Sequence, residues 1–407
     1  MLPFAEARAR LVALARALPG ERVALERAFG RVLSEDVRAT TDLPRVTHST
    51  MDGYALRIDD LGAGVDGAFA LPVIGESRAG LSPNPLAPAS AMRIFTGAAL
   101  PDGADAVLPQ EDTTRDGDTL RFARAPAKGA SIRHVGDDLR AGAVAIPAGT
   151  RLTASPFALA LALDVVTVMV ARAPRVTLVA TGDELRAAGD TVGATAASLP
   201  DCLCPALARV LEREGAHVVV APFVPDDRER TERALDDALA SSDLVVTIGG
   251  ASVGDHDLVK PALTAVGATI DFWRVAIKPG KPLLVGTRGH TIVLGLPGNP
   301  ASALVTFALF GIPLVRTLAG AKDASPLTFR ATLTRAIRHA AGRTEFVRAR
   351  LERGDTGPRV TPLANQASGA VLSMSDADAL VIVDQARGDL SEGEVVDVLP
   401  YAGIGLS

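Results

Sequence analysis

From residue 174 onward, apolar runs of strand length alternate with longer segments of helical periodicity. The strand-like runs are PRVTLVAT, HVVVAPFV, DLVVTIGG and TIVLGL, and the helix-like segments between them are DCLCPALARVLEREG, RERTERALDDALASS and DLVKPALTAVG. A final segment, NPASALVTFALFGIPLVRTL, predicts a helix with Asn299 as its cap and Pro300 at its first position. Strands and helices alternating over about 150 residues predict a doubly wound, mostly parallel sheet.

The chain has a different pattern before and after this region. Between residues 46 and 133, short strand-like runs alternate with Gly, Pro and Asp turns, which predicts a small β domain. The flanking segments each combine helix-like and strand-like pieces, and we expect them to pack together with the β domain inserted between them. The predicted organisation is an elongated N-terminal domain (1–45 and 134–170), an inserted β domain (46–133), an α/β domain (171–322) and a C-terminal β-barrel (323–407).

Composition limits the classes of function. A chain of 407 residues exceeds what one hydrophobic core usually supports. Its 4% aromatic content argues against base-stacking surfaces, and its net charge of −5 draws in neither nucleic acid nor anionic membrane. An anionic ligand must therefore be held by local cations, which directs attention to Arg274, Lys278 and Lys281.

Cysteine usage and the apolar segments predict a cytoplasmic protein without a membrane anchor. Cys202 and Cys204 cannot form a disulfide framework, and we expect both to be inert buried thiols. The six histidines show no pair at zinc-ligand spacing. The N-terminus resembles an amphipathic helix rather than a signal peptide, and the apolar run 156–171 is interrupted by Asp164 and too short to span a bilayer.

Three glycine turns follow apolar runs between residues 243 and 300. Ligands bind at strand ends of open α/β sheets, because backbone N–H groups and helix N-termini point into the crevice there. The turns carry Asp255, Asp257, Lys278, Lys281 and Asn299. This combination predicts a site for a polyanion held with a metal; ordinary tight turns in a glycine-rich chain are the alternative. Neither the G-x-G-x-x-G nor the G-x-x-x-x-G-K-[ST] pattern is present, which disfavours dehydrogenases and P-loop enzymes.

Carboxylates also follow the first strand, since the turn TGDE supplies Asp183 and Glu184. If adjacent strands bring this turn next to Asp255 and Asp257, up to four carboxylates share one crevice. Such a cluster needs a divalent cation or a proton to neutralise it, and magnesium prefers oxygen ligands. Alternatively, Asp183 and Asp255 only cap helices.

The segment IKPGKP predicts a stiff cationic loop. Pro279 and Pro282 fix two backbone angles and Gly280 lets the chain turn, so Lys278 and Lys281 project from a fixed base.

Polar groups elsewhere have simpler explanations from composition alone. Asp52 and Thr96 in the β domain could reach a ligand, although Asp-Gly is also hairpin chemistry. Arg133 and Asp138 belong to a charge cluster that composition alone assigns to the surface.

Taken in order, the motifs resemble the molybdopterin molybdenumtransferase family of the MoeA type, related to the E domain of gephyrin. They are STMDGYA, RIFTGAALPDGADAV, IRHVGDDLRAGAV, TGDEL, GGASVGDHD, AIKPGKP, GLPGNPAS and NQASGAVLSMSDADAL. The resemblance covers essentially the whole chain. It implies a homodimer whose active cleft lies between the α/β domain of one subunit and the β domain of the other. The implied reaction is insertion of molybdate into adenylylated molybdopterin, with Mg²⁺-dependent release of AMP; molybdoenzyme maturation proteins are implied partners.

The resemblance also assigns roles to residues. The implied catalytic residues are Asp52, Thr96, Glu184, Asp226, Asp257 and Lys278. The implied binding residues are Arg133, Asp138, Gly249, Gly250, Ser252, Arg274, Lys281, Gly298, Asn299 and Ser368, and Arg348 also fits a family position. Glu184 and Asp257 would hold magnesium or shuttle protons, Lys278, Lys281 and Arg133 would neutralise phosphate and molybdate, and Asp52 and Thr96 would act from the opposite subunit.

Two departures leave alternatives open. Where the family reads Asp-Ser/Thr-Asn followed by a basic residue, this chain has Asp201-Cys202-Leu203-Cys204, and a frequent lysine is Arg274 here. A divergent nucleotide-processing hydrolase would bind AMP-like ligands without molybdate dependence. A non-catalytic molybdopterin-binding scaffold would not need Glu184, Asp257 and Lys278 to converge.

Overall fold

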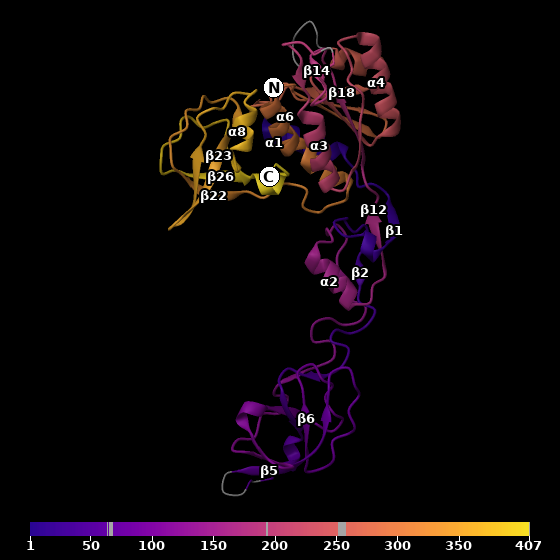
Figure 1. Cartoon of the computed structure of the whole chain (residues 1–407), viewed down its shortest axis with the longest axis vertical. Coiled ribbons are helices and arrows are strands. Elements are labelled where there is room, and N and C mark those ends of the chain that lie inside the picture. The colour runs from indigo at the N-terminus through magenta and orange to yellow at the C-terminus, as the bar shows by residue number, and fades with distance from the viewer. Residues whose placement is uncertain (63, 65–67, 193, 251–257, 407) are drawn as a thin grey trace. The chain divides into compact units, whose positions relative to one another are not determined.

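The computed structural model describes residues 1–406 except 63, 65–67, 193 and 251–257. The chain divides into two compact units. Unit 1 comprises Met1–Glu35, Ala148–Phe157 and Val166–Ser407, and unit 2 comprises Asp36–Pro147 and Ala158–Val165 (Figure 1). The finer four-domain boundaries remain a prediction.

Unit 1 is built around a six-stranded sheet. Its strands, in spatial order, are β16 (His217–Val220), β13 (Arg175–Ala180), β17 (Leu244–Ile248), β21 (Thr291–Leu296), β20 (Leu284–Arg288) and β18 (Thr269–Trp273). The first four are mutually parallel, whereas β20 runs antiparallel to both of its neighbours. The predicted mostly parallel sheet is confirmed, but the sequence pattern did not reveal β18 and β20.

Helices cover both faces of this sheet because its side chains alternate between two apolar clusters. Val176 and Leu178 of β13 face the cluster that includes α1, α3, α6 and α7, while Val179 faces the cluster that includes α4 and α5. The helices are α1 (Phe4–Leu14), α3 (Leu203–Arg213), α4 (Arg228–Ser241), α5 (Val259–Ala265), α6 (Pro300–Thr306) and α7 (Ile312–Leu318). A π-helical segment, η4 (Phe307–Gly311), joins α6 to α7.

The helical stretch Pro300–Leu318 is long and apolar enough to cross a membrane, but 83% of its most apolar window is buried inside the protein. It is therefore a core helix of the sheet domain.

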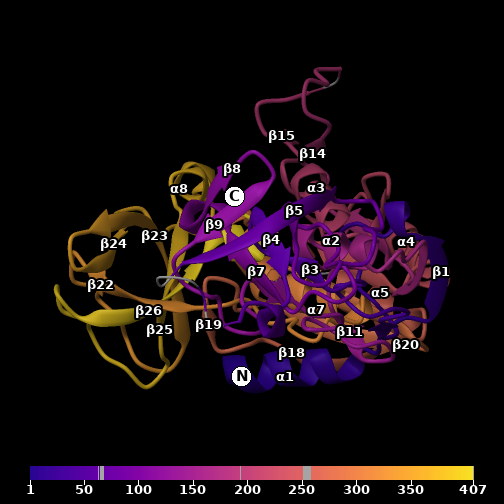
Figure 2. The ribbon, with the colours of Figure 1, turned by 90° about the horizontal axis from the view of Figure 1, so that it is seen from below.

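The C-terminal part of unit 1 forms a closed five-stranded barrel, as predicted. Its strands are β22 (Phe329–Leu333), β23 (Thr344–Gly354), β24 (Gly357–Pro362), β25 (Ala379–Val383) and β26 (Val395–Pro400). The order β23-β24-β22-β26-β25 closes because β25 also pairs with β23. The segment IKPGKP (277–282), called the lysine loop below, contributes a short strand, β19 (Ile277–Lys278), which adds to the barrel beside β23. Figure 2 shows the barrel strands grouped together, with β19 next to β23.

Unit 2 holds a second six-stranded sheet, formed within the region of short strand-like runs between residues 46 and 133. Its strands, in spatial order, are β7 (Ala106–Pro109), β4 (Gly53–Leu56), β6 (Ala91–Ile94), β5 (Phe69–Ser77), β9 (Thr119–Phe122) and β8 (Thr114–Asp116). Tyr54, Leu71 and Leu120 are among its buried core residues.

Strands from the two flanking segments pair with each other. The pairs are β1 (Gly20–Ala24) with β12 (Thr167–Ala171), and β2 (Val37–Arg38) with β11 (Val144–Ile146). Both pairings agree with the expectation that segments 1–45 and 134–170 pack together.

Candidate functional site

Three turns meet at the carboxyl edge of the unit 1 sheet, because β13, β17 and β21 are adjacent and parallel. Backbone hydrogen bonds link them: Thr181 N–H donates to the Ile248 carbonyl at 3.1 Å, and Gly249 N–H donates to the Leu296 carbonyl at 3.2 Å. The close approach requires glycine, since a Cβ on Gly249 would lie 2.9 Å from the Thr181 carbonyl oxygen. This edge is a single platform that carries Glu184, Gly249, Gly250 and Gly298.

Carboxylates project from this platform. Asp183, Glu184 and Asp226 are all exposed. The Asp183 carboxylate accepts from the backbone N–H of Asp226 at 3.1 Å, so it ties two neighbouring turns together rather than capping a helix. The cap of α4 is Asp227, which accepts from Arg230 N–H at 2.9 Å.

The predicted four-carboxylate cluster remains a prediction. Asp255 and Asp257, with Ser252, lie outside the described residues. Among the residues that the structure describes, no three His, Cys, Asp or Glu side chains lie close enough to hold a metal ion.

The lysine loop is closed by a backbone hydrogen bond, and one of its two lysines is anchored. Lys278 Nζ lies 2.8 Å from Glu345 Oε1, an ion pair with a carboxylate that the sequence reasoning did not identify. Val275 N–H donates to the Lys281 carbonyl at 3.1 Å, closing the loop. At Gly280, φ is 99° and a Cβ would lie 2.0 Å from Thr306 Cγ2. Lys281 itself is exposed.

Arg274 occupies a strained position beside the loop. Its φ is 71°, and its guanidinium stacks 3.9 Å from the centre of the Trp273 ring. The same ring is approached by Lys260 Nζ at 4.3 Å. Two cations thus contact one aromatic ring, and the planar guanidinium of arginine suits such stacking.

The start of α6 is joined to a loop of the C-terminal region. Asn299 occupies the N-cap position, but its side chain makes no capping hydrogen bond, contrary to expectation. The N–H of Ala301 donates instead to the backbone carbonyl of Ser368 at 3.0 Å. Because the Ser368 carbonyl takes one helix-start donor, fewer N–H groups than predicted are available to an anion.

Arg348 holds the loop that contains Ser368. This arginine is only 1% exposed, and its Nη2 donates to the carbonyls of Asn365 and Ala367 at 3.2 and 3.0 Å. Its Nε and Nη1 have no partner among the described residues, and burial lowers its pKa. The predicted residues Arg348, Ser368 and Asn299 are therefore connected through one loop.

In unit 2, Asp52 and Thr96 form a pair. Asp52 Oδ1 accepts from both the backbone N–H and the hydroxyl of Thr96, each at 2.8 Å. These two hydrogen bonds, the backbone one first, lower the pKa of Asp52. The Asp52 side chain thus fixes a neighbouring strand end instead of only closing a hairpin.

The second pair of unit 2 is Arg133 with Asp138, which form an ion pair at the surface. The nearby Asp137 carboxylate accepts from His134 N–H at 2.7 Å. The charge of Arg133 is therefore partly compensated by Asp138. This agrees with the interpretation, made from composition, that these residues form a surface charge cluster.

At residues 201–204 the chain keeps the family's aspartate, Asp201, just before α3, and departs from the family pattern in Cys202, Leu203 and Cys204. Cys202 holds the N-cap position of α3, but Asp201 Oδ1, one residue earlier, accepts from the N–H groups of Leu203 and Cys204 at 2.9 and 3.1 Å and so satisfies two donors at the helix start. Cys204 is buried, and burial followed by the Asp201 charge raises its pKa. The prediction of two buried thiols is wrong for Cys202, which lies outside the first turn and is exposed.

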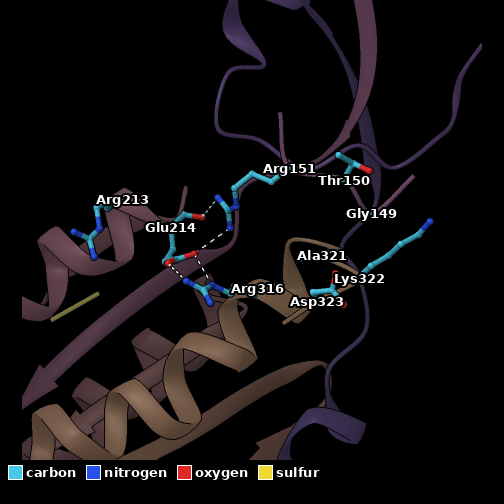
Figure 3. A pocket seen from close by; sticks show the side chains of 9 residues that line it. All are labelled: Gly149, Thr150, Arg151, Arg213, Glu214, Arg316, Ala321, Lys322 and Asp323. Carbon is cyan, nitrogen blue, oxygen red and sulfur yellow. Dashed lines mark hydrogen bonds and ion pairs between the residues drawn. The ribbon is translucent and has the colours of Figure 1, made fainter. Parts of the chain in front are cut away.

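A separate cavity of about 430 Å³ is lined by none of the predicted site residues. Figure 3 shows Glu214 between Arg151 and Arg316, with Lys322 extending away from them. Glu214 Oε1 and Oε2 lie 2.7 and 3.0 Å from Arg316 Nη2 and Arg151 Nη2. Both arginines share one buried carboxylate, so the cluster is a structural ion-pair network.

Known protein families match almost the whole chain. Residues 2–163 match the MoeA N-terminal region (domain I and II), residues 177–317 match a probable molybdopterin binding domain, and residues 330–401 match the MoeA C-terminal region (domain IV). The molybdopterin molybdenumtransferase of Haemophilus influenzae is 34% identical over 388 residues, which is 94% of each chain. The chain belongs to the MoeA family of molybdopterin molybdenumtransferases.

Other relatives agree with this assignment. The molybdopterin molybdenumtransferase of Staphylococcus aureus is 31% identical over 98% of this chain and 95% of its own length. A solved molybdopterin biosynthesis MoeA protein from Pyrococcus horikoshii superimposes with a TM-score of 0.81 at 30% identity, covering 98% of this chain and 99% of its own. The protein is thus a transferase of molybdenum cofactor biosynthesis, and it binds molybdopterin.

Proposed function

We propose that this transferase inserts molybdenum from molybdate into adenylylated molybdopterin and releases AMP at the carboxyl edge of the unit 1 sheet. The observation that supports this place is the set of adjacent glycine turns after β13, β17 and β21, within the region that matches a molybdopterin-binding domain. The homologous transferases supply the reaction class. The substrate form and the AMP product are part of the proposal.

The chemistry requires positive charge and a proton route. Molybdate and the phosphoanhydride of an adenylylated pterin are both anionic, and Lys278 and Lys281 would neutralise them. A unit charge pair at 4 Å contributes about 4 kcal/mol at an effective dielectric of 20, compared with about 1 kcal/mol in bulk water. Each oxo group that leaves molybdate as water takes up protons, and Glu184 is the exposed carboxylate at the turn after β13 that would deliver them.

Magnesium fits the donor chemistry of this edge, since Glu184 and Asp226 present exposed carboxylates on neighbouring turns. Hard oxygen donors of this kind suit Mg²⁺. We propose Glu184 and Asp257 as its protein ligands, and the bound ion would neutralise phosphate charge. Asp226, in the turn before α4, would help to orient the groups that hold the ion.

The remaining binding groups would position the pterin and its nucleotide. Gly249, Gly250, Ser252 and Gly298 would allow close approach of backbone N–H groups to phosphate, and Asn299, Ser368 and Arg274 would border the ligand. Gly249 and Gly250 have φ of 85° and 59°, which favour glycine.

We further propose that the protein acts as a homodimer with a shared site. Asp52, Thr96, Arg133 and Asp138 belong to unit 2, and the other described site residues belong to unit 1. In the proposed dimer, unit 2 of one subunit supplies the first set to unit 1 of the other. The product would pass, in the cytoplasm, to proteins that mature molybdoenzymes.

The test of the reaction is AMP release from adenylylated molybdopterin by the purified protein, with Mg²⁺ and increasing molybdate. We expect release to rise with molybdate and to fall at least about 100-fold in Glu184→Gln, within the range for loss of an acid–base group. Glu212→Gln is the matched control, because Glu212 is an exposed glutamate paired with Arg209 on α3. AMP release that does not depend on molybdate would indicate a nucleotide hydrolase. Binding of adenylylated molybdopterin without release of AMP would indicate a scaffold.

A further inference from the structure

Glu345 is a buried carboxylate at the point where the lysine loop meets the C-terminal barrel. Its side chain is only 7% exposed, whereas the side chain of its partner Lys278 is 47% exposed. Burying a carboxylate is unfavourable unless charged or hydrogen-bonding partners compensate for the lost water. Glu345 has two such partners, one on each oxygen.

The first partner is Lys278, and the backbone enforces the contact. Strand β19 pairs with β23 in parallel, with Lys278 directly opposite Glu345. Thr344 N–H also donates to the Ala276 carbonyl at 2.9 Å. The Lys278 backbone is therefore fixed by strand pairing, and its Nζ is held by Glu345 Oε1 at 2.8 Å. An ammonium has three N–H donors, so this contact leaves donors for an anion.

The second partner is His339, whose Nδ1 lies 2.8 Å from Glu345 Oε2. The imidazole is only 2% exposed, and its Nε2 has no partner among the described residues. Because a carboxylate only accepts hydrogen bonds, the proton of this contact belongs to Nδ1. The His339 backbone is fixed in turn, since its N–H donates to the Asp389 carboxylate at 2.7 Å.

We propose that Glu345 is a positioning residue for molybdenum transfer: it sets the location of the Lys278 ammonium, and His339 orients Glu345. This inference rests on the proposed role of Lys278 in neutralising the substrate anion. A long lysine side chain loses much rotamer freedom when it is fixed, and fixing it before the substrate arrives removes that cost from the reaction. Residues of the barrel, remote in sequence from the lysine loop, would then determine how well the loop works.

The test measures kcat and KM for AMP release together with thermal unfolding. We expect Glu345→Gln to lower kcat/KM roughly 10- to 100-fold, the range for a displaced catalytic group, and Glu345→Asp to retain more activity because it keeps the charge. His339→Phe should lower kcat/KM about as much as Glu345→Gln. His339→Asn keeps a hydrogen-bond donor and should retain much of the activity. Glu214→Gln is the matched control: it also removes the charge of a buried glutamate with two side-chain partners, here Arg151 and Arg316, but away from the site, and should lower stability without changing kcat/KM.

A double-mutant cycle separates positioning from a purely structural role. If Glu345 acts through Lys278, Glu345→Gln should have no further effect on kcat/KM in a Lys278→Met background. Independent, multiplying losses would overturn the inference, and so would an unchanged kcat/KM in Glu345→Gln when Lys278→Met is severely impaired. If Lys278→Met itself keeps full activity, the proposed role of Lys278 fails instead.

Discussion

Asp52 and Thr96 are joined through a single carboxylate oxygen, which accepts two hydrogen bonds of 2.8 Å from the backbone and the hydroxyl of Thr96. Hydrogen bonds to the charged form of a carboxylate favour that form. The lowered pKa of Asp52 therefore marks it as a fixed anion rather than a proton donor at neutral pH.

This pair leads to a prediction for Thr96→Val, which removes the hydroxyl donor but keeps the backbone donor. The pKa of Asp52 should rise toward its ordinary value of 3.8, as followed by NMR titration of the side-chain carboxyl. AMP release should fall roughly tenfold because Asp52 is less well oriented. Thr96→Ser keeps the hydroxyl and should behave like the wild type. If the pKa of Asp52 is unchanged in Thr96→Val, the hydroxyl of Thr96 does not lower that pKa.

Glu214 predicts how stability depends on pH. Burial alone would raise the pKa of Glu214, but hydrogen bonding and charge from Arg316, then the charge of Arg151, outweigh burial and hold the pKa below its ordinary value of 4.5. A lowered folded-state pKa gives stability that is present above pH 4.5 and is lost as pH falls through the folded-state pKa.

At pH 7, Glu214→Gln should reduce the free energy of unfolding by about 2 kcal/mol, less than for a fully buried pair because both arginines are partly exposed. Urea unfolding at a series of pH values measures this. The difference between wild type and variant should narrow as the solution is acidified below pH 4.5. A difference that stays constant down to the acid unfolding of the protein would exclude the ion pairs as its cause.

The lysine loop predicts a strict requirement for glycine at position 280. A Cβ there would lie 2.0 Å from Thr306 Cγ2, so Gly280→Ala should displace the loop, lower AMP release and destabilise the protein by about 3 kcal/mol. Gly289→Ala is the control, since Gly289 also has positive φ but open space around it, and should cost only about 1 kcal/mol with normal activity. Equal effects of the two substitutions on activity would show that crowding against Thr306 does not matter.

The two cysteines should differ in reactivity. With the native protein, a maleimide reagent should label Cys202, which is exposed, and leave Cys204, which is buried; burial raises the pKa of both thiols, so accessibility makes the difference. Mass spectrometry of the labelled peptide distinguishes the two sites, and both should react after unfolding. Cys202→Ser should abolish native labelling; rapid labelling of Cys204 in the folded protein would contradict its burial.

Much of the fold could be predicted from local patterns. Buried strands such as β13 and β17 are short apolar runs next to helices with a clear 3.6-residue period, and each run became a strand of the parallel part of the sheet. Strands β18 and β20 were missed because the βα alternation stops there and their pairing is antiparallel. Local sequence contains no information about which neighbour a strand will choose at that point.

The candidate site could be predicted only in part, for a related reason. Glycine turns and the double-proline loop are local features, so Gly249, Gly280 and Lys278 could be selected from sequence. The contact of Lys278 with Glu345 depends on β19 joining the barrel, and the use of the Ser368 carbonyl by Ala301 depends on a loop docking onto α6. Such long-range contacts are set by tertiary packing, which leaves no periodic pattern in the chain.

The most direct test of a site shared between two subunits combines two inactive variants in one dimer. Asp52→Asn and Lys278→Met chains, carrying different affinity tags, are co-expressed and the mixed dimer is isolated through both tags. A shared site makes one of the two sites in this dimer intact, so AMP release should recover to about half the wild-type rate per dimer, as expected for a two-fold symmetric assembly. A mixed dimer no more active than either variant alone, or a protein that forms no dimer, would contradict the shared site.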